Sequence, residues 1–501
     1  MTNGLELGDI YGATIERIKA QDGDKSRLGM TALMWISHAE RPLQVDELCH
    51  ALAVQLGSTD FDVGNIPSMS TLVNCCQGLI TVDKEASTVR LIHFTLQEYL
   101  SAHPDIFIKP HSAMAEICLT YLNSKQVKAL STTHSPDTQN PPFLEYCSVY
   151  WGVHAKKELS DYGRSLALGL LKEPYNQIST ELLLAHANLY YKGHNTCPPF
   201  SGLHCASFFG IVEVVAGLIE VGGSDINGEG YLGCTPLSWA AHNGHEEVVK
   251  VLLGQGGANP DKENRDGETP LLHAALNGHE GVVKILLERE EVNPDRADET
   301  GQTPLLYAAR NGHEAVVKIL LGRGGVNPDK PNIWGQTPLS DAARNGHEGV
   351  VKILLGREEV SPDRADDWGR TPLSYAARNG HEAVVKILLG WEEVNPEKAN
   401  IFGRTPLSDA ALCGHEGVVE ILLGREDVNP DGADGEGRTP LSCAAGNGHE
   451  GVVKILLGRK EVNPDKADKR GSTPLSYASS SGHNRIVALL QSHKEAAPRT
   501  I

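Results

Sequence analysis

A period of 34 residues constrains the fold of this chain more than any other feature. The dipeptide Thr-Pro recurs eight times between Thr235 and Thr473, and successive copies are always 34 residues apart. Gly-His keeps the same step from Gly244 to Gly482, and a ninth, diverged copy (SGLHCASFFGIVEVVAGLI) lies one period upstream at 201–219. Such self-similarity predicts a repeat protein in which each unit contacts only its neighbours.

The residues of one unit predict two short helices joined by a tight turn. Thr is expected to cap the first helix, and Pro fits its first turn, where the missing N–H costs nothing. Gly ends that helix in a conformation that other residues resist. The run VVxILL gives the second helix an apolar stripe, which one unit cannot bury alone. Stacked units would therefore share one continuous core.

The unit TPLxxAAxxGHExVVxILL, followed by VNPDxAxxxG, resembles the ankyrin repeat, which usually runs one residue shorter. The aromatic signature of tetratricopeptide repeats is missing. The resemblance implies a solenoid of about nine repeats that binds protein. It also implies that the His of each Gly-His bonds to backbone at the turn. We therefore predict no metal ion, no cofactor and no catalytic residue, and we interpret the acidic loop runs as solvated charge.

Variation between near-identical copies marks the positions that are free to contact a partner. The residue before Ala-Ala changes from repeat to repeat and is twice Asp, which would be costly in a core. We therefore expect this position to reach solvent, on the concave face that the resemblance implies. The variable residues form two columns. The first, directly before Ala-Ala, contains Trp239, His273, Tyr307, Asp341, Tyr375, Asp409, Cys443 and Tyr477. The second, three residues later, contains His242, Leu276, Arg310, Arg344, Arg378, Leu412, Gly446 and Ser480.

Large aromatic residues follow one another at three hairpin tips, at Trp334, Trp368 and Phe402. Equivalent positions of a solenoid lie side by side, so these rings are expected to form a ladder; alternatively, each ring covers its own hairpin or a neighbouring loop. Trp391 interrupts a column of Arg. Tyr and Arg are also favoured at binding hot spots. The predicted partner-binding residues are Trp334, Trp368, Phe402, Tyr307, Arg310, Asp341, Arg344, Tyr375, Arg378, Asp409 and Trp391.

The first 200 residues contain no repeat and predict a winged helix. MTALMWISHAER, PLQVDELCHALAV and SMSTLVNCCQGL are expected to be helices, and LITVD and VRLIHFT two strands joined by a turn at 84–87. In a DNA-binding winged helix the third helix would be the recognition helix. Here it carries no Lys or Arg, and direct readout of bases needs such donors. Binding to nucleic acid is therefore not expected.

The segment from LGMTALMWISHAERPLQVDELCHALAV to LIHFTLQEYLSAHPDIF resembles the winged helix of fungal NACHT–ankyrin proteins, NTPases related to NOD-like receptors. His93-Phe94-Thr95 and Glu98-Tyr99-Leu100 match its closing motif. In those proteins a nucleotide-binding domain comes before this segment, with a phosphate loop ending in Gly-Lys-Ser/Thr. This chain has no Gly-Lys dipeptide, so we expect it to lack the NTPase domain. The resemblance implies the recognition part of an immune-type or self/non-self receptor, and a separate subunit as the source of the NTPase.

Composition narrows the remaining classes of function. The net charge of −19 disfavours nucleic acid, and no apolar run is long enough to span a membrane. Without a visible secretory signal or a disulfide framework among ten cysteines, a cytoplasmic protein is expected. Two alternatives to a binding scaffold stay open: a spacer without a dedicated ligand, and an enzyme within residues 1–200, although that region shows no nucleophile elbow or phosphate loop.

We thus predict a mainly α protein with four parts. A winged-helix-like domain spans 1–105, and a helical connector spans 106–200 with a loop near 132–142. The ankyrin solenoid spans 201–492 and a C-terminal tail 493–501.

Overall fold

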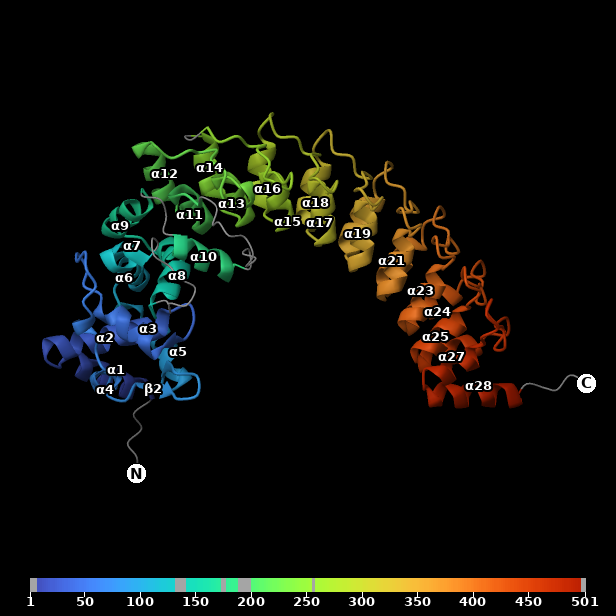
Figure 1. Ribbon diagram of the computed structural model, residues 1–501, viewed down its shortest axis with the longest axis horizontal. Helices are drawn as coiled ribbons and strands as arrows, with labels where there is room; N and C mark the ends of the chain where they lie inside the picture. Colours follow the sequence, from blue (N-terminus) through green and yellow to red (C-terminus); the bar gives the residue numbers. More distant parts are fainter. Residues whose placement is uncertain (1–6, 131–140, 173–176, 188–199, 255–256, 497–501) are drawn as a thin grey trace, which may run out of the picture. The chain divides into compact units, whose positions relative to one another are not determined.

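The computed structural model describes residues 7–130, 141–172, 177–187, 200–254 and 257–496 (Figure 1). These residues are mainly helical, which confirms the predicted fold class, and the chain divides into two compact units, Met1–Asn259 and Pro260–Ile501. In the described ranges, no helix is long and apolar enough to cross a membrane. The predicted loop at 132–142 falls outside those ranges except for its last two positions.

The first unit begins with the predicted winged helix. Its elements are α1 (Leu7–Lys19), α2 (Gly23–His38), β1 (Leu43–Gln44), α3 (Val45–Ala53), η1 (Val63–Asn65), α4 (Met69–Cys75), β2 (Ile80–Asp83), β3 (Thr88–Leu91) and α5 (Phe94–Ala102). The strands form an antiparallel sheet in the order β1-β3-β2, with Leu43 opposite Val89. Sequence reasoning missed β1, because two residues are too short to show an alternating pattern.

A helical segment follows, and it shares a core with the winged helix. Its elements are η2 (Pro104–Ile106), α6 (Pro110–Asn123), α7 (Lys125–Leu130), α8 (Leu144–Lys157), α9 (Asp161–Leu171) and α10 (Gln177–His186). The ring of Trp35 on α2 meets Phe143 and Tyr146 edge-on, at centroid distances of 5.5 and 5.6 Å. Such pairs stabilise beyond the area that they bury, so this aromatic cluster fixes α2 against α8.

The described residues then contain nine helix pairs of the repeat, as predicted, two in the first unit and seven in the second. The first unit holds α11 (Gly202–Phe209), α12 (Val212–Val221), η3 (Tyr231–Gly233), α13 (Pro236–His242) and α14 (Glu246–Gly254). There α11 packs against α8, where the rings of Trp151 and Phe209 lie 5.2 Å apart.

The second unit holds the remaining seven pairs. They are α15 (Pro270–Leu276), α16 (Glu280–Leu287), α17 (Pro304–Arg310), α18 (Glu314–Leu321), α19 (Pro338–Asn345), α20 (Glu348–Leu355), α21 (Pro372–Asn379), α22 (Glu382–Leu388), α23 (Pro406–Cys413), α24 (Glu416–Leu423), α25 (Pro440–Asn447), α26 (Glu450–Leu457), α27 (Pro474–Ser480) and α28 (Asn484–Ala496). First helices stack on first helices, as α19 does on α21, and second helices on second helices, as α20 does on α22.

The repeat residues play the local roles that the sequence predicted. The side chain of Thr337 accepts the backbone N–H of Ser340 at 3.2 Å and caps α19. Gly346 ends the helix with a φ of 77°, a left-handed conformation that Gly adopts readily. His381 Nε2 donates to the carbonyl of Arg344, 37 residues earlier. The same bond is made by His313, His347, His415, His449 and His483. This confirms the structural role expected for the repeat His, and each bond ties one repeat to the one before it.

Candidate functional site

The hairpin tips of the second unit are organised by an Asn or Asp side chain near the start of each turn. Asn332 Oδ1 accepts the backbone N–H groups of Trp334 and Gln336, both at 3.0 Å. Gly335 between them has a φ of 77°, which lets the turn close. The corresponding acceptors in the next two repeats are Asp366, which holds Trp368 and Arg370, and Asn400, which holds Phe402 and Arg404. The repeated pattern Asn/Asp-x-x-Gly was the available signal, and sequence reasoning did not use it.

Backbone bonds connect neighbouring tips and so bring the three aromatic positions into one row. The carbonyl of Trp334 accepts the N–H of Asp367 at 3.1 Å, and the carbonyl of Trp368 accepts that of Ile401 at 3.0 Å. The predicted side-by-side placement is therefore present in the backbone. Among the described residues, however, no ring contact joins Trp334, Trp368 and Phe402, so the row is not a stack of rings.

The tips carry more exposed apolar surface than the sequence analysis proposed. Trp334 is 38% exposed and Phe402 52%, whereas Trp368 is half-buried beside the guanidinium of Arg370. Ile333 and Ile401, which directly precede two of these rings, are also exposed. Sequence reasoning missed both isoleucines because it searched only one column for aromatic residues.

The expectation that the column before Ala-Ala reaches solvent is wrong for six of its eight residues, because Trp239, His273, Asp341, Tyr375, Asp409 and Cys443 are all buried. Asp341 and Asp409 are each 1% exposed, and Tyr375 is buried too. Each Asp is held by an Arg of the preceding repeat: Arg310 lies 2.8 Å from Asp341, and Arg378 lies 3.2 Å from Asp409. Burial raises the pKa of both carboxyl groups, and the guanidinium partners oppose that shift. The argument from the cost of burying Asp failed because it left out this partner.

The identity of the residue before Ala-Ala is matched to that of the hairpin residue nine positions earlier in the same repeat. The Tyr307 hydroxyl donates to Asp298 at 2.8 Å, and the Tyr375 hydroxyl donates to Asp366 at 2.6 Å, in both cases nine residues earlier. Tyr477 and Asp468 make the same bond. Where the column holds Asp341 or Asp409, the hairpin position is instead Asn332 or Asn400. An Asn there avoids placing two carboxylates against each other.

A hollow of about 680 Å³ lies between the tips and the first helices of two repeats. Six predicted binding residues line it: Tyr307, Arg310, Trp334, Asp341, Arg344 and Trp368. Thr300, Gln302, Asn311, Gln336 and Asn345 complete the lining. The hollow does not include Tyr375, Arg378, Phe402, Asp409 or Trp391.

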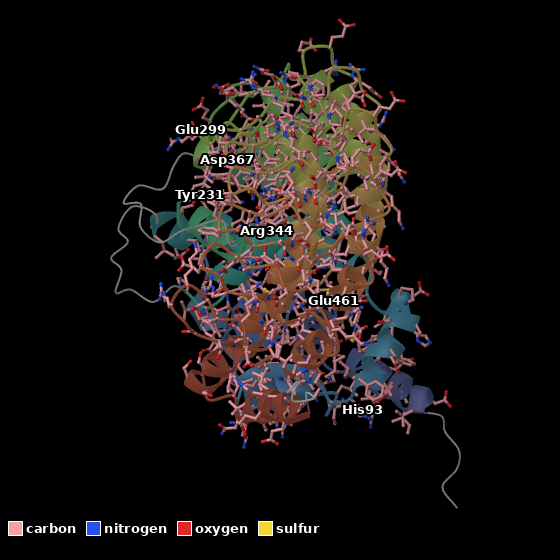
Figure 2. All side chains as sticks on the ribbon, turned by 90° about the vertical axis from the view of Figure 1, so that its right-hand side faces the viewer. His93, Tyr231, Glu299, Arg344, Asp367 and Glu461 are labelled. Atoms are coloured by element: carbon pink, nitrogen blue, oxygen red, sulfur yellow. The ribbon has the colours of Figure 1, made fainter. Side chains whose placement is uncertain are left out.

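Arg344, labelled in Figure 2, is the charged residue of this hollow that is best placed to bind a ligand. It is exposed, its guanidinium lies 5.7 Å from the ring centre of Tyr375, and no salt bridge of the described residues includes it. Arg310, by contrast, is neutralised by Asp341. The lining therefore carries one net positive charge within a chain of net charge −19.

Trp391 lies at a different place, in the turn after α22, and is 39% exposed. Its column is otherwise Arg. Arg357 donates to the carbonyl of Leu321 and Arg425 to that of Leu389, each at 3.0 Å. These Arg residues link the ends of successive second helices, a role that an indole cannot repeat with the same reach.

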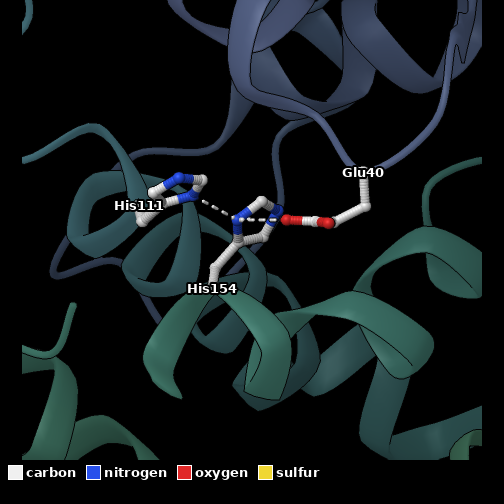
Figure 3. A group of neighbouring side chains, drawn as sticks. All are labelled: Glu40, His111 and His154. Carbon is white, nitrogen blue, oxygen red and sulfur yellow. Dashed lines mark hydrogen bonds and ion pairs between the residues drawn. The ribbon is translucent and has the colours of Figure 1, made fainter. Parts of the chain in front are cut away.

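A second candidate site lies in the first unit, where no metal ligand was predicted. Glu40, His111 and His154 place one ligand atom each within 4.8 Å of one another (Figure 3). His154 is fully buried, and burial is the largest cause that lowers its pKa, to about 3. Burial also lowers the pKa of His111. Both imidazoles are therefore neutral near pH 7, the form that can bind a metal ion.

Comparison with known families agrees with this architecture. Residues 16–107 are similar to the family described as "GPI inositol-deacylase, winged helix domain". No curated protein matches the chain. The family described as "Ankyrin repeats (3 copies)" matches seven overlapping stretches, at 175–264, 203–298, 256–332, 282–364, 317–400, 339–432 and 425–500. These stretches span well over half of the sequence, so the chain belongs to the ankyrin repeat family.

Proposed function

We propose that this chain is a protein-binding scaffold whose recognition site is the hollow lined by Tyr307, Arg310, Trp334, Arg344 and Trp368. The observation that carries the proposal is Arg344, an exposed guanidinium that no salt bridge of the described residues includes, in a hollow that Trp334 and Trp368 also line. Arg and Trp are the residue types that most often dominate binding energy. The proposed ligand is a protein segment with a carboxylate next to an aromatic or aliphatic side chain.

The exposed apolar tips extend this surface. Ile333, Trp334, Ile401 and Phe402 lie on tips joined through the intervening one at Trp368. An aromatic side chain removes roughly 150–250 Å² from water when it is buried. A spacer without a ligand gains nothing from such exposure, whereas clustered apolar surface is typical of interaction sites. These tips therefore favour a binding scaffold over a spacer.

The charge of the protein adds selectivity. The rest of the molecule is acidic and repels acidic partners at long range, whereas the hollow attracts one carboxylate at short range. We expect the bound segment to carry a single acidic side chain rather than an acidic run.

The N-terminal half supports a finer proposal about the biological role. The winged helix and the motif at His93-Phe94-Thr95 resemble those of fungal NACHT–ankyrin proteins. We propose that the chain is the recognition part of an immune-type or self/non-self receptor in the cytoplasm. An NTPase subunit would contact the winged helix and supply the nucleotide switch, and the chain itself would bind without catalysing a reaction.

The test is selection of peptides from a random displayed library on the intact chain. The proposal expects enrichment of sequences with one Asp or Glu beside an aromatic or aliphatic residue. Binding of the selected peptides should fall at least about tenfold with Arg344→Ala or Trp334→Ala, as hot-spot truncation does. Trp391→Ala is the matched control, because this Trp is equally exposed but lies outside the hollow.

Two results would contradict the proposal. One is enrichment of sequences without an acidic residue. The other is equal loss of binding with Trp391→Ala and Trp334→Ala. Far-ultraviolet circular dichroism of each variant establishes that the repeats are folded before binding is compared.

A further inference from the structure

Three potential metal ligands converge where the winged helix meets the helical segment. Glu40 lies in the connection between α2 and β1, His111 in the first turn of α6 and His154 in the last turn of α8. His154 Nδ1 lies 2.9 Å from His111 Nδ1 and 3.8 Å from Glu40 Oε1. Figure 3 shows the carboxylate and the second imidazole both facing this one nitrogen.

The two separations from His154 Nδ1 are close to those of a tetrahedral metal site, and all three ligand atoms lie within 4.8 Å of one another. Two nitrogen or oxygen donors bound at 2.0–2.1 Å to a tetrahedral Zn²⁺ lie about 3.3 Å apart. The observed 2.9 and 3.8 Å lie on either side of this value. Glu40 is a flexible side chain that is 21% exposed, so a small rotation of its carboxylate would complete the geometry.

The surroundings hold the buried imidazole in place by its other nitrogen. His154 Nε2 lies 2.9 Å from the hydroxyl of Tyr146, which also accepts the backbone N–H of Glu40 at 3.2 Å. When Nε2 carries the proton and donates it to Tyr146, Nδ1 presents its lone pair to the cluster. Outer hydrogen bonds of this kind orient the His ligands of metal sites.

One positive charge competes for the same carboxylate. Lys157 Nζ lies 2.6 Å from Glu40 Oε1, and its side chain is 46% exposed. A divalent cation would have to displace this ammonium group, which can move into solvent. Lys157 therefore weakens metal binding without blocking it.

We propose that Glu40, His111 and His154 bind Zn²⁺ through three protein ligands, with a solvent molecule in the fourth position. Imidazole and carboxylate donors suit this ion, and three such ligands leave one position open. The bound ion would clamp the winged helix to α6 and α8. This site is independent of the recognition hollow, which lies in the other unit.

The test uses Co²⁺ as a spectroscopic probe and Zn²⁺ as its competitor on the full chain, after treatment with a chelator and a reductant. The proposal expects one Co²⁺ per chain with visible absorption bands of nitrogen and oxygen ligation, and Zn²⁺ should abolish these bands. His111→Ala and Glu40→Gln should weaken binding by at least about tenfold. Lys157→Met should tighten binding by several-fold, because it removes the competing charge.

The controls separate this site from others on the chain. His381→Ala removes a repeat His that bonds to backbone, and it should leave metal affinity unchanged. Thiolate charge-transfer bands would indicate binding at cysteine and would overturn the proposal. So would affinities in His111→Ala and Glu40→Gln equal to that of the unmodified chain. The tightening expected for Lys157→Met cannot arise from misfolding, so the test holds even if one ligand variant is unstable.

Discussion

Arg310 closes over Asp341 of the next repeat, with its Nε and a terminal nitrogen 3.0 and 2.8 Å from the same carboxylate oxygen. The carboxylate is buried, while the guanidinium is one-third exposed. The pair thus links α17 to α19 and at the same time forms one wall of the recognition hollow. We therefore expect stability and the proposed binding to depend on the same two residues.

Removal of Arg310 should destabilise the second unit. Arg310→Leu leaves Asp341 buried without its cationic partner, which costs about 3–5 kcal/mol for a fully buried pair. Because Arg310 reaches solvent, we expect a smaller loss of about 1–3 kcal/mol in the free energy of unfolding. Urea denaturation followed by circular dichroism measures it. The further change Asp341→Asn should recover part of the loss; no recovery would show that the guanidinium acts through packing alone.

Tyr before Ala-Ala occurs with Asp in the hairpin, and Asp before Ala-Ala occurs with Asn. This alternation predicts an energetic coupling between positions 332 and 341. Asp341→Tyr places a hydroxyl opposite Asn332, whereas the natural Tyr residues donate to Asp298 and Asp366. Adding Asn332→Asp should restore that bond and recover about 0.5–3 kcal/mol, the range of couplings between residues in contact. A double-mutant cycle on unfolding free energies measures the coupling. Additive effects of the two changes would show that the alternation has no energetic basis.

The aromatic tips should separate binding from stability. Trp334 is partly exposed, so Trp334→Ala should change the free energy of unfolding by less than about 1 kcal/mol while weakening peptide binding. Asn332→Ala removes the acceptor of two backbone N–H groups and should cost about 1–3 kcal/mol. Comparison of the two urea midpoints tests this. A large loss of stability with Trp334→Ala would mean that the ring is packing for its own hairpin.

The turn glycines offer a matched pair of substitutions within one repeat. Gly346 has a φ of 77°, and an added Cβ would lie 2.6 Å from His381 Nδ1. Gly346→Ala should therefore cost about 2 kcal/mol or more, from strain and from the displaced His. Gly356 has a φ of −74°, and its added Cβ would make only ordinary contacts, the nearest at 3.4 Å. Gly356→Ala should be neutral or stabilising by up to about 1 kcal/mol. Equal losses at both sites in urea unfolding would contradict this account.

Sequence reasoning succeeded where structure is determined locally and failed where it depends on contacts between repeats. The Thr cap, the turn Gly and the apolar stripe act within a few residues, so one unit was enough to predict the helices. The burial of Asp341 depends on an Arg 31 residues earlier. The signal existed in the alternation of Asp298 and Asn332, but its meaning needs the geometry of the hairpin.

The histidine cluster could not be predicted at all from spacing. Glu40, His111 and His154 come from three separate elements, and His111 and His154 are 43 residues apart in a region without repeats. Ligand pairs on one helix would have been visible as a short motif. These three positions meet only because α6 packs against α8 and α2, and because Tyr146 of α8 contacts Trp35 of α2.

The stability of the first unit should depend on pH through His204, which is buried in α11. Its Nδ1 accepts the backbone N–H of Ser201 at 3.2 Å, and its Nε2 lies 3.0 Å from the carbonyl of Gly228. Nε2 therefore carries the proton, and a second proton on Nδ1 would face the N–H of Ser201. Burial is the largest cause that lowers the pKa of His204, to about 4, from 6.5 in the unfolded chain.

The direction of the effect follows from these two pKa values. Below pH 6.5 the unfolded chain binds a proton that the folded chain does not, so folding is favoured less as the pH falls. The contribution of His204 is complete above pH 6.5, declines between pH 6.5 and 4, and changes no further below pH 4. The whole difference is about 3 kcal/mol, at 1.36 kcal/mol per pKa unit.

His204→Gln should be less stable at pH 7 but should lose less stability between pH 6.5 and 4. Urea midpoints of the first unit across this range measure both slopes, and because other buried His residues titrate in both proteins, the difference between the slopes isolates His204. Identical slopes would mean that His204 already accepts its proton in the folded protein at an ordinary pH.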